Sequence, residues 1–352
     1  MKLYQIVEIA GKFNHAGSKA TSDVAEIAEK IGFIPLRLHM NTTAGTMLAK
    51  LERQFGYWQD WRNITEMIED DSLVLLQHPF HYPQLTREAS LKYLKEKKHV
   101  KFISVIHDVE KLRAFRYNDY YKQEFEFMRR IADVYIVHNE VMKSYFVNLG
   151  ISADNIIVLD IFDYLLDDTY KKFPVFSKSL SIAGNLDITK CAYISELPCL
   201  SQLQIDLYGS NYDKKLNAYS NIHYHGSFPP DDIPAQLNHG FGLVWDGSSI
   251  DGCKGESGHY LKYNNPHKLS LFLASGLPIV IWKDAAEASF VESRNLGICV
   301  NDLMEAEKMI VSFSQEEYMK KAVSVKKISS ELTKGVFMQH AINEALNRFV
   351  IE

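Results

Sequence analysis

Short apolar segments and longer helical patterns alternate along almost the whole chain. In the first half, the segments YQIVEI, SLVLLQ and KFISVI are short and rich in β-branched or other apolar residues, and a helical pattern follows each of them. Parallel strands joined by crossover helices produce this alternation. The pattern therefore predicts an α/β fold, and it constrains the architecture more than any other feature of the sequence.

The alternation falls into two sets, which a polar segment separates. The sequence DDTYKKFPVFSKS is charged and contains a proline, which is typical of a linker. The 352 residues also suit two domains of about 150 residues each. We therefore predict a Rossmann-like N-terminal domain over 1–166, a linker over 167–179, a Rossmann-like C-terminal domain over 180–335 and a helical segment over 336–352.

Helical periodicity also predicts the limits of the connecting helices. We expect them over residues 21–31, 44–69, 84–97, 111–130, 139–148, 186–196, 231–238 and 285–293. Two doubly wound sheets that face each other place the carboxyl ends of both sets of strands along one cleft, where ligands bind in such sheets. The functional residues should therefore follow strands.

Composition excludes several classes of protein. The formal net charge is -5, and no block is rich in lysine or arginine, so we expect no nucleic-acid partner. No run approaches the roughly 18 apolar residues of a membrane span. The cysteines form no C-x-x-C pair, so they indicate free thiols and a cytoplasmic protein; they are Cys191, Cys199, Cys253 and Cys299.

The segment YLKYNNPHKLSLFLASGLPIVIW combines lysines and asparagines with the start of a helix. Asn265 followed by Pro266 matches an N-cap followed by proline at the first helical position. A helix N-terminus presents free N–H groups and partial positive charge, to which Lys268 and Lys262 add full charges. This arrangement predicts a diphosphate site, completed by Asn264, Asn265 and His267. The alternative is a plain helix-turn-strand crossover with two solvated lysines.

Glycine and small polar residues follow the other strands predicted in the second half. They occur in AGNLD, YGSNYD, HGSF and WDGSS. Glycines at the same edge of a sheet allow a nucleotide to approach the backbone closely, although glycine after a strand is common in α/β proteins.

Several of these segments together resemble a known family. The motifs AGNL, YG, HGSF, GLVWDG and KYNNPHKLSLFLASGLPIV are similar to the C-terminal half of GT-B glycosyltransferases, specifically the bacterial glucosyltransferase-3 family. That family elongates N-acetylglucosamine-modified serine-rich-repeat adhesins and has galactofuranosyltransferase relatives. The N-terminal motifs NHAGSKATSDVAEIAEKIGF, LQHPF and SVIHDVEKLR are similar to it too, so the resemblance covers nearly the whole chain.

The resemblance implies a GT-B fold with two Rossmann-like domains facing across a cleft. It implies a UDP-sugar donor on the C-terminal domain, a glycan or glycoprotein acceptor mainly on the N-terminal domain, and a homotetramer. The expected reaction transfers a hexose, glucose first, to N-acetylglucosamine on a serine-rich-repeat glycoprotein. The alternatives are a galactofuranosyl or other hexosyl transferase for a surface polysaccharide, and a non-catalytic nucleotide-sugar-binding subunit. The final helical segment crosses back to the first domain or packs an oligomer interface.

The resemblance assigns expected roles to residues at the strand ends. Tyr208 and the Gly209 amide border the uracil or ribose, unless Tyr208 only packs against a neighbouring strand. Gly184 and Asn185 line the same edge.

Two acidic residues and one loop complete the expected donor site. Asp246 and Glu256 bind sugar or ribose hydroxyls, or else cap loops. Gly17 and Ser18 lie in a loop before a helix that starts near Thr21, where their amides face the sugar or its phosphate. The alternative for that loop is an ordinary helix cap.

A base within hydrogen-bond reach of the acceptor hydroxyl assists transfer, and three candidates follow N-terminal strands. They are His78, His107 and Asp108. Each has a structural alternative: Asp108 caps the next helix or pairs with Arg113.

The sequence also predicts that no metal or cofactor takes part. It contains no Asp-x-Asp motif, which metal-dependent glycosyltransferases of the other major fold use, and its thirteen histidines are scattered. We therefore expect metal-independent transfer, in which lysine and the helix dipole neutralise the diphosphate. A dehydrogenase is disfavoured because no G-x-G-x-x-G follows an early strand.

Overall fold

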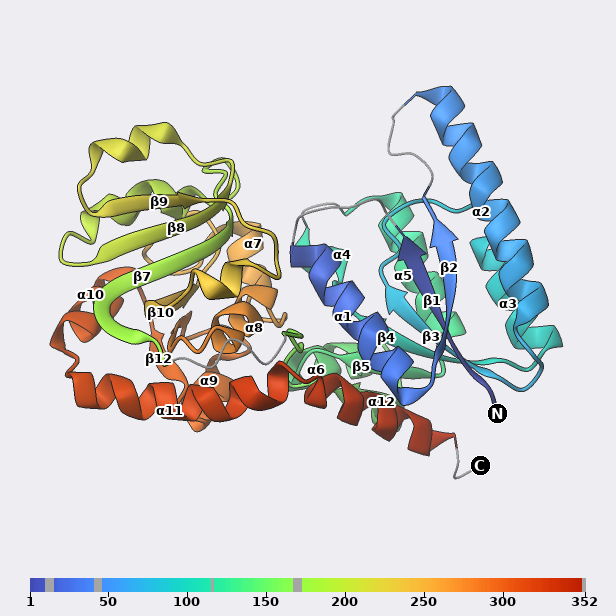
Figure 1. Cartoon of the computed structure of the whole chain (residues 1–352). Coiled ribbons are helices and arrows are strands. Elements are labelled where there is room, and N and C mark those ends of the chain that lie inside the picture. Colours follow the sequence, from blue (N-terminus) through green and yellow to red (C-terminus); the bar gives the residue numbers. More distant parts are fainter. Residues whose placement is uncertain (10–15, 41–45, 115–116, 167–172, 350–352) are drawn as a thin grey trace.

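The computed structural model describes residues 1–9, 16–40, 46–114, 117–166 and 173–349, and only the backbone for residues 16–18. These ranges form two parallel sheets of six strands each, with helices packed against them (Figure 1). The predicted α/β class with two Rossmann-like halves is confirmed.

The first sheet has the strand order β2-β1-β3-β4-β5-β6. Leu73 and Leu75 face a core that includes helices α1 and α12, whereas Val74 and Leu76 face a second core that includes α2 and α3. Because both faces are covered, its strands are apolar almost throughout. The elements are β1 Leu3–Ile9, α1 Ala16–Ile31, β2 Ile34–His39, α2 Met47–Met67, β3 Leu73–His78, α3 Arg87–Lys97, β4 Lys101–Ile106, α4 Glu110–Arg113, α5 Asp119–Ile131, β5 Val134–Val137, α6 Glu140–Asn148, η1 Ala153–Asn155 and β6 Ile156–Val158.

The second sheet has the order β12-β11-β10-β7-β8-β9. A single large core joins its strands to the surrounding helices. The elements are β7 Val175–Asn185, η2 Ala192–Cys199, β8 Gln204–Ser210, η3 Lys214–Ala218, β9 Ile222–Gly226, η4 Ile233–Ala235, β10 His239–Val244, α7 Gly255–Tyr260, α8 His267–Ala274, β11 Ile279–Trp282, α9 Ala288–Ser293, β12 Gly297–Val300, α10 Leu303–Ser312, α11 Gln315–Leu332 and α12 Val336–Arg348.

Two helices of the first half differ from their predicted limits. The helix expected over 21–31 begins at Ala16, because Lys19 pairs with Asp23 one turn later at 2.8 Å and stabilises an earlier turn. The single helix expected over 111–130 is divided into α4 and α5. Ala114, with φ of 60°, ends the first of these, and Asn118 caps the second.

Two helices predicted in the second half are wrong. The segment 186–196 contains a turn around Asp187, whose carboxylate accepts from the Thr189 amide, and the 3₁₀ helix η2 starts only at Ala192. The segment 231–238 contains only the short 3₁₀ helix η4, with Pro234 inside it. Hydrogen bonds from side chains to the backbone disfavour an α-helix, and so does proline. Hydrophobic periodicity alone does not reveal either effect.

The limits of the predicted linker also differ from the structure. Residues 167–172 lie outside the described residues, and β7 already begins at Val175. The last five residues of the predicted linker therefore belong to a strand of the second sheet.

The C-terminal helix α12 packs on the first sheet. Its buried residues Met338, Ala341 and Ile342 share one core with Val24 and Ile27 of α1. Figure 1 shows α11 running along the second half of the molecule and α12 continuing beneath the first half. The chain thus crosses back to the domain in which it began.

Replacement of Ile342 by alanine should destabilise the protein by about 2 to 5 kcal/mol, because it empties a fully buried position between α12 and the first sheet. Urea denaturation followed by circular dichroism measures the loss. Val323→Ala is the matched control, since this side chain is 46% exposed, and it should change stability by less than about 0.5 kcal/mol. Equal losses in both variants would contradict the packing of α12.

Candidate functional site

The order of the second sheet defines one preferred place for a ligand. From β7 the chain adds β8 and β9 on one side and then β10, β11 and β12 on the other, so the direction reverses between β7 and β10. Ligands of open α/β sheets bind at the carboxyl ends of the strands at such a switch point. Gly184 and Asn185 end β7, and Trp245 and Asp246 follow β10, so these residues border the expected crevice.

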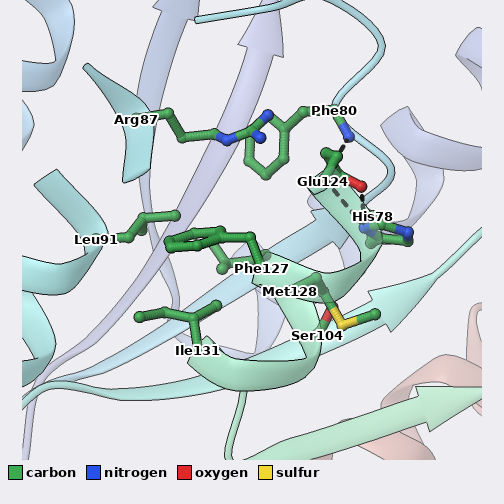
Figure 2. A pocket seen from close by; sticks show the side chains of 10 residues that line it. His78, Phe80, Arg87, Leu91, Ser104, Glu124, Phe127, Met128 and Ile131 are labelled. Atoms are coloured by element: carbon green, nitrogen blue, oxygen red, sulfur yellow. Dashed lines mark hydrogen bonds and ion pairs between the residues drawn. The ribbon is translucent and has the colours of Figure 1, made fainter. Parts of the chain in front are cut away.

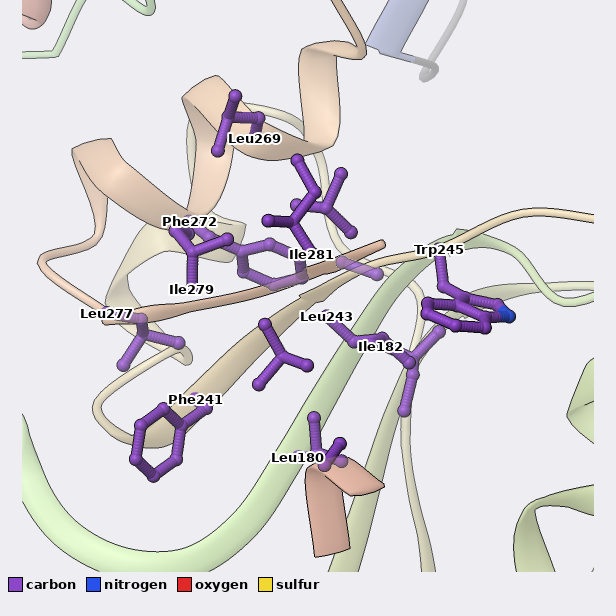
Figure 3. Packing of buried hydrophobic residues seen from close by; sticks show 14 of the residues in the cluster. Leu180, Ile182, Phe241, Leu243, Trp245, Leu269, Phe272, Leu277, Ile279 and Ile281 are labelled. Atoms are coloured by element: carbon purple, nitrogen blue, oxygen red, sulfur yellow. The ribbon is translucent and has the colours of Figure 1, made fainter. Parts of the chain in front are cut away.

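Helix α8 reaches this crevice because it packs unusually close to β10. A Cβ atom on Gly242 would lie 2.2 Å from Cγ of Phe272, so only glycine allows the contact. Figure 3 shows Phe272 and Leu269 of α8 directed toward β10 and β11, among the side chains of the second core. The N-terminus of the helix is thereby held beside the end of β10.

Lys268 links the helix to the end of that strand. Its Nζ donates to the Trp245 carbonyl at 2.8 Å and lies 3.5 Å from Oδ2 of Asp246. Burial lowers the pKa of Lys268, but Asp246 together with the nearby Cys191 and Cys253 outweighs this effect, and the net pKa is raised. Asp246 is itself fixed, since its Oδ1 accepts from the Gly247 amide at 2.9 Å. The structure thus brings two predicted donor-site residues together and holds a charged ammonium at the switch point.

Unpaired polar atoms concentrate at the mouth of α8. Of the twelve buried side-chain polar atoms that have no hydrogen-bond partner in the described part of the chain, four belong to residues 264–267. They are Oδ1 of Asn264, Oδ1 of Asn265 and both ring nitrogens of His267, whose ring interacts only weakly with the Asp163 backbone. Buried polar groups are rarely left unsatisfied, so this concentration indicates a place for a polar ligand or water.

Asn265 does not have its predicted role as helix cap. The helix starts at His267 with Pro266 in the N-cap position. Asn265 is 3% exposed, and it donates from its backbone N to Nδ1 of His138 at 2.8 Å and from Nδ2 to the Asp160 carbonyl at 2.9 Å. Contacts with the first domain therefore determine the position of Asn265. Such contacts cannot be inferred from the residues next to it in the sequence.

His267 lies in the first turn of α8, against the first domain. Its ring stacks on Tyr164 with centroids 5.1 Å apart. Burial lowers its pKa to about 4, and the nearby Lys19 charge adds to this effect. His267 is therefore neutral near pH 7 and offers one donor and one acceptor nitrogen.

The structure places two other predicted donor residues apart from Lys268. Lys262 lies 3.3 Å from Oδ2 of Asp284, and its ammonium is 5.0 Å from the centre of the Trp282 ring. Glu256 is exposed and belongs to the short helix α7 rather than to a loop. Neither residue shares a contact with Lys268.

The ends of β7 and β8 lie side by side, as their register requires. Gly184 pairs with Gly209, and a Cβ atom on Gly209 would lie 1.7 Å from the Gly184 carbonyl oxygen. Asn185 is exposed, and its Oδ1 accepts from Nδ2 of Asn211 at 2.8 Å. Gly184 and Asn185 are exposed at this edge, whereas Gly209 is buried against the backbone of Gly184.

Tyr208 occupies the core rather than this edge. It is 2% exposed, and its ring stacks on His225 with centroids 4.6 Å apart. The Tyr208 ring therefore has no exposed face on which uracil could stack. Its position matches the alternative that it packs against a neighbouring strand.

Gly17 and Ser18 lie in the first turn of α1 instead of in a preceding loop. The N-terminus of α1 follows β1, so their backbone is at the carboxyl edge of the first sheet. Residues 10–15, which precede them, lie outside the described residues.

Two of the predicted bases have structural partners. His78 is 3% exposed, and its Nδ1 lies 2.9 Å from Oε2 of Glu124, within the small pocket of Figure 2. Asp108 forms its predicted pair with Arg113 at 2.7 Å and also accepts from the Tyr260 hydroxyl at 3.1 Å. Its carboxylate makes no cap bond to α4.

His107, the third candidate, is a weak base. Its Nε2 lies 2.7 Å from Oε1 of Gln77, and its ring stacks on Phe162 with centroids 5.1 Å apart. Burial lowers its pKa to about 3, with a smaller contribution from His138. The imidazole is therefore neutral at pH 7 and has little affinity for a proton.

The two domains meet at the carboxyl ends of the first sheet. Tyr260 of α7 contacts Asp108 after β4, and Asn265 before α8 contacts His138 after β5. The Ser270 hydroxyl donates to the Phe162 carbonyl at 2.6 Å. The strand ends of the first domain thus lie next to the helices that border the candidate donor site.

Within the described residues, no group of three histidine, cysteine, aspartate or glutamate side chains is arranged to hold a metal ion. No described helix is long and apolar enough to cross a membrane.

Solved structures share the fold of this chain over almost its whole length. The crystal structure of Anabaena Alr3699/HepE in complex with UDP and glucose has a TM-score of 0.60 at 14% identity and covers 99% of both chains. An alpha-glucosyltransferase in complex with UDP has a TM-score of 0.62 at 12% identity and covers 99% of this chain and 100% of that one. The expected GT-B fold is confirmed by this likeness.

Sequence relatives define the class of enzyme. Beta-1,6-galactofuranosyltransferase WbbI of Escherichia coli K12 is 32% identical over 252 residues, which are 70% of this chain and 72% of the relative. Glucosyltransferase 3 of Streptococcus gordonii is 24% identical over 332 residues, or 93% of each chain. The protein is therefore a glycosyltransferase with a GT-B fold.

Family models cover both halves. The model described as "Glucosyltransferase 3-like, N-terminal domain" matches residues 3–161, and the one described as "Glucosyltransferase 3-like, C-terminal domain" matches residues 180–345. The chain belongs to the glucosyltransferase 3-like family, as its motifs indicated.

Proposed function

We propose that this enzyme transfers glucose from UDP-glucose to a hydroxyl of N-acetylglucosamine on a serine-rich-repeat glycoprotein. The observation that carries the donor half of the proposal is the ammonium of Lys268, which lies at the switch point of the second sheet beside unpaired polar atoms. The similarity to Glucosyltransferase 3 of Streptococcus gordonii supports glucose, and the complexes of the structural neighbours with UDP support a UDP-linked donor.

A second candidate is transfer of galactofuranose or another hexose to a surface polysaccharide. It is favoured by the higher identity to the galactofuranosyltransferase, 32% against 24% for Glucosyltransferase 3 of Streptococcus gordonii. A panel of UDP-sugars, screened first for thermal stabilisation and then for UDP release with candidate acceptors, distinguishes the two. UDP binding without turnover on any acceptor would contradict both.

The proposed chemistry at the donor site is electrostatic. The diphosphate lies at the N-terminus of α8, where free N–H groups and the helix dipole favour negative charge. Lys268 adds a full positive charge, and Asn264 and His267 offer the polar atoms that the protein leaves unpaired. These groups stabilise the negative charge that UDP acquires as it leaves the anomeric carbon. The Gly184, Asn185 and Gly209 edge holds the nucleoside.

We propose a cytoplasmic location and a homo-oligomer, with an apolar ridge on α2 as the contact between subunits. All four cysteines are free thiols, which supports a reducing compartment. The ridge consists of exposed side chains at helical spacing, which a second copy would cover. Its members are Met47, Leu48, Leu51, Phe55 and Trp58.

Replacement of Lys268 by alanine should weaken UDP binding at least about tenfold, because a charge-assisted contact to a phosphate contributes about 1.5 to 3 kcal/mol. Isothermal titration calorimetry measures the affinity. Lys320→Ala removes an exposed lysine of α11 that pairs with Glu316, and it should leave UDP binding unchanged. Unaltered affinity in the Lys268 variant would exclude this lysine from the site.

Turnover should survive treatment with EDTA, because the ammonium of Lys268 and the N-terminus of α8 supply the positive charge at the diphosphate. UDP release is measured before and after the chelator is added. Lost activity that manganese restores would argue for a metal-dependent reaction instead.

The double variant Leu51→Ser, Phe55→Ser should shift the protein from an oligomer toward the monomer, since it places two hydroxyls on the ridge. Light scattering coupled to size-exclusion chromatography gives the mass. Val323→Ser on α11 changes another exposed apolar residue and should leave the mass unaltered. A monomeric wild-type protein would refute the oligomer proposal.

A further inference from the structure

The first sheet has a switch point of its own. Its order reverses between β1 and β3, with β2 on one side and β4, β5 and β6 on the other. The β1–β3 ladder contains three residue pairs and ends at Gln5 and Leu75, although β1 continues to Ile9 and β3 to His78. The two strands therefore separate toward their carboxyl ends, which is where such a sheet binds ligands.

A carboxylate lies at this separation. Glu8, next to last in β1, is an exposed residue, and its Oε1 accepts from Nε2 of Gln84 at 2.6 Å. Gln84 is held at its other end, because its Oε1 accepts from Nε1 of the fully buried Trp61 at 2.8 Å. No other described donor bonds to the Glu8 carboxylate. One of its oxygens is thus fixed in place, and the other remains available to a ligand.

A buried cation lies beside it. Arg87 is 3% exposed, yet no described carboxylate lies within ion-pairing distance of its guanidinium. It donates from Nη1 to the Tyr120 hydroxyl at 3.3 Å and lies over the ring of Phe80, 4.8 Å from its centre (Figure 2). A buried charge normally has a direct counter-ion. Four of the five N–H donors of a guanidinium remain for another ligand.

The charged groups that face Glu8 come from three helices. Although Glu8 as a whole residue is exposed, the protein packed around its carboxylate partly desolvates this group and raises its pKa to about 7. Arg87 of α3 and the Gln84 hydrogen bond lower this pKa, whereas Glu124 of α5 raises it. Burial raises the pKa of Tyr57 on α2 and of Tyr120 on α5, and the charge of the Glu8 carboxylate adds to both shifts. Glu8 is therefore partly protonated at neutral pH.

We propose that Glu8 is the catalytic base that accepts the proton of the acceptor hydroxyl, that Gln84 positions it, and that Arg87 binds a neighbouring oxygen of the same sugar. The assignment rests on the proposed function. A carboxylate acceptor near a guanidinium donor suits a polyhydroxylated ligand, and the half-buried Tyr120 contacts that guanidinium through its hydroxyl. The acceptor is thus a hexose or hexosamine at the carboxyl edge of the first sheet.

The step balances as a displacement at the anomeric carbon. The acceptor oxygen forms a bond to that carbon while the bond from the same carbon to the β-phosphate oxygen breaks. UDP leaves with the electron pair, and the hydroxyl proton moves to the carboxylate of Glu8. A base with a pKa near the working pH is effective in such a transfer.

The test uses UDP-glucose and p-nitrophenyl N-acetylglucosaminide with the full-length protein. Glu8→Gln should lower kcat by about 10² to 10⁴, while UDP affinity by calorimetry stays within about threefold of wild type. Glu52→Gln on α2 replaces an exposed carboxylate and is the matched control, for which kcat should not change. Retained UDP binding shows that the variant is folded.

The pH profile separates a base from a structural carboxylate. In the wild type, kcat/KM should rise as pH increases through about 7, because only the ionised carboxylate accepts a proton. This rise is the acidic limb of the pH profile. Glu8→Asp should retain the limb with a lower kcat, and Glu8→Gln should lose it. In Gln84→Met the limb should move to higher pH, since the lost hydrogen bond no longer lowers the pKa of Glu8.

Turnover of Glu8→Gln within about threefold of wild type would overturn the assignment, as would a reduced turnover that retains the limb. Either result leaves the donor site intact. A wild-type protein that binds no UDP would instead contradict the proposed function, and with it the assignment of Glu8.

Discussion

The contact between Gly242 and Phe272 determines the position of the proposed donor site. Only a residue without Cβ lets α8 approach β10 so closely, and this approach places Lys268 within hydrogen-bond distance of the Trp245 carbonyl. The site then needs no flexible loop to deliver a positive charge, because a packed helix and a buried strand hold it. Electrostatic stabilisation is strongest when the charges are fixed in this way before the reaction begins.

The two sheets divide the proposed reaction between them. Each sheet reverses its strand order once, and each reversal has charged side chains at its carboxyl edge: Lys268 and Asp246 in the second sheet, Glu8 and Arg87 in the first. Contacts such as Asn265 with His138 join the domains between these two places. The topology of the two sheets therefore agrees with a reaction in which UDP, the leaving group, binds at the second sheet and the acceptor hydroxyl, the nucleophile, binds at the first.

Much of the architecture could be predicted from periodicity and motifs, and the failures have physical causes. The strands and the start of α8 near residue 266 follow from local patterns, and the role of Lys268 at a diphosphate stays a prediction. The break at Ala114 and the turn at Asp187 depend on single backbone and side-chain geometries. Asn265 and Tyr208 were assigned to the donor site because of their neighbours in sequence, whereas contacts from distant segments bury both. Glu8 was missed because a lone acidic residue within a strand carries no signal until the strand order is known.

The position of α12 has a consequence for synthesis on the ribosome. The thirteen residues of this helix follow the second domain in the sequence, yet they fill the core of the first domain. That domain therefore waits with part of its apolar surface uncovered while the entire second domain is translated. Emergence of α12, rather than completion of the first half, is therefore the event that closes its interior.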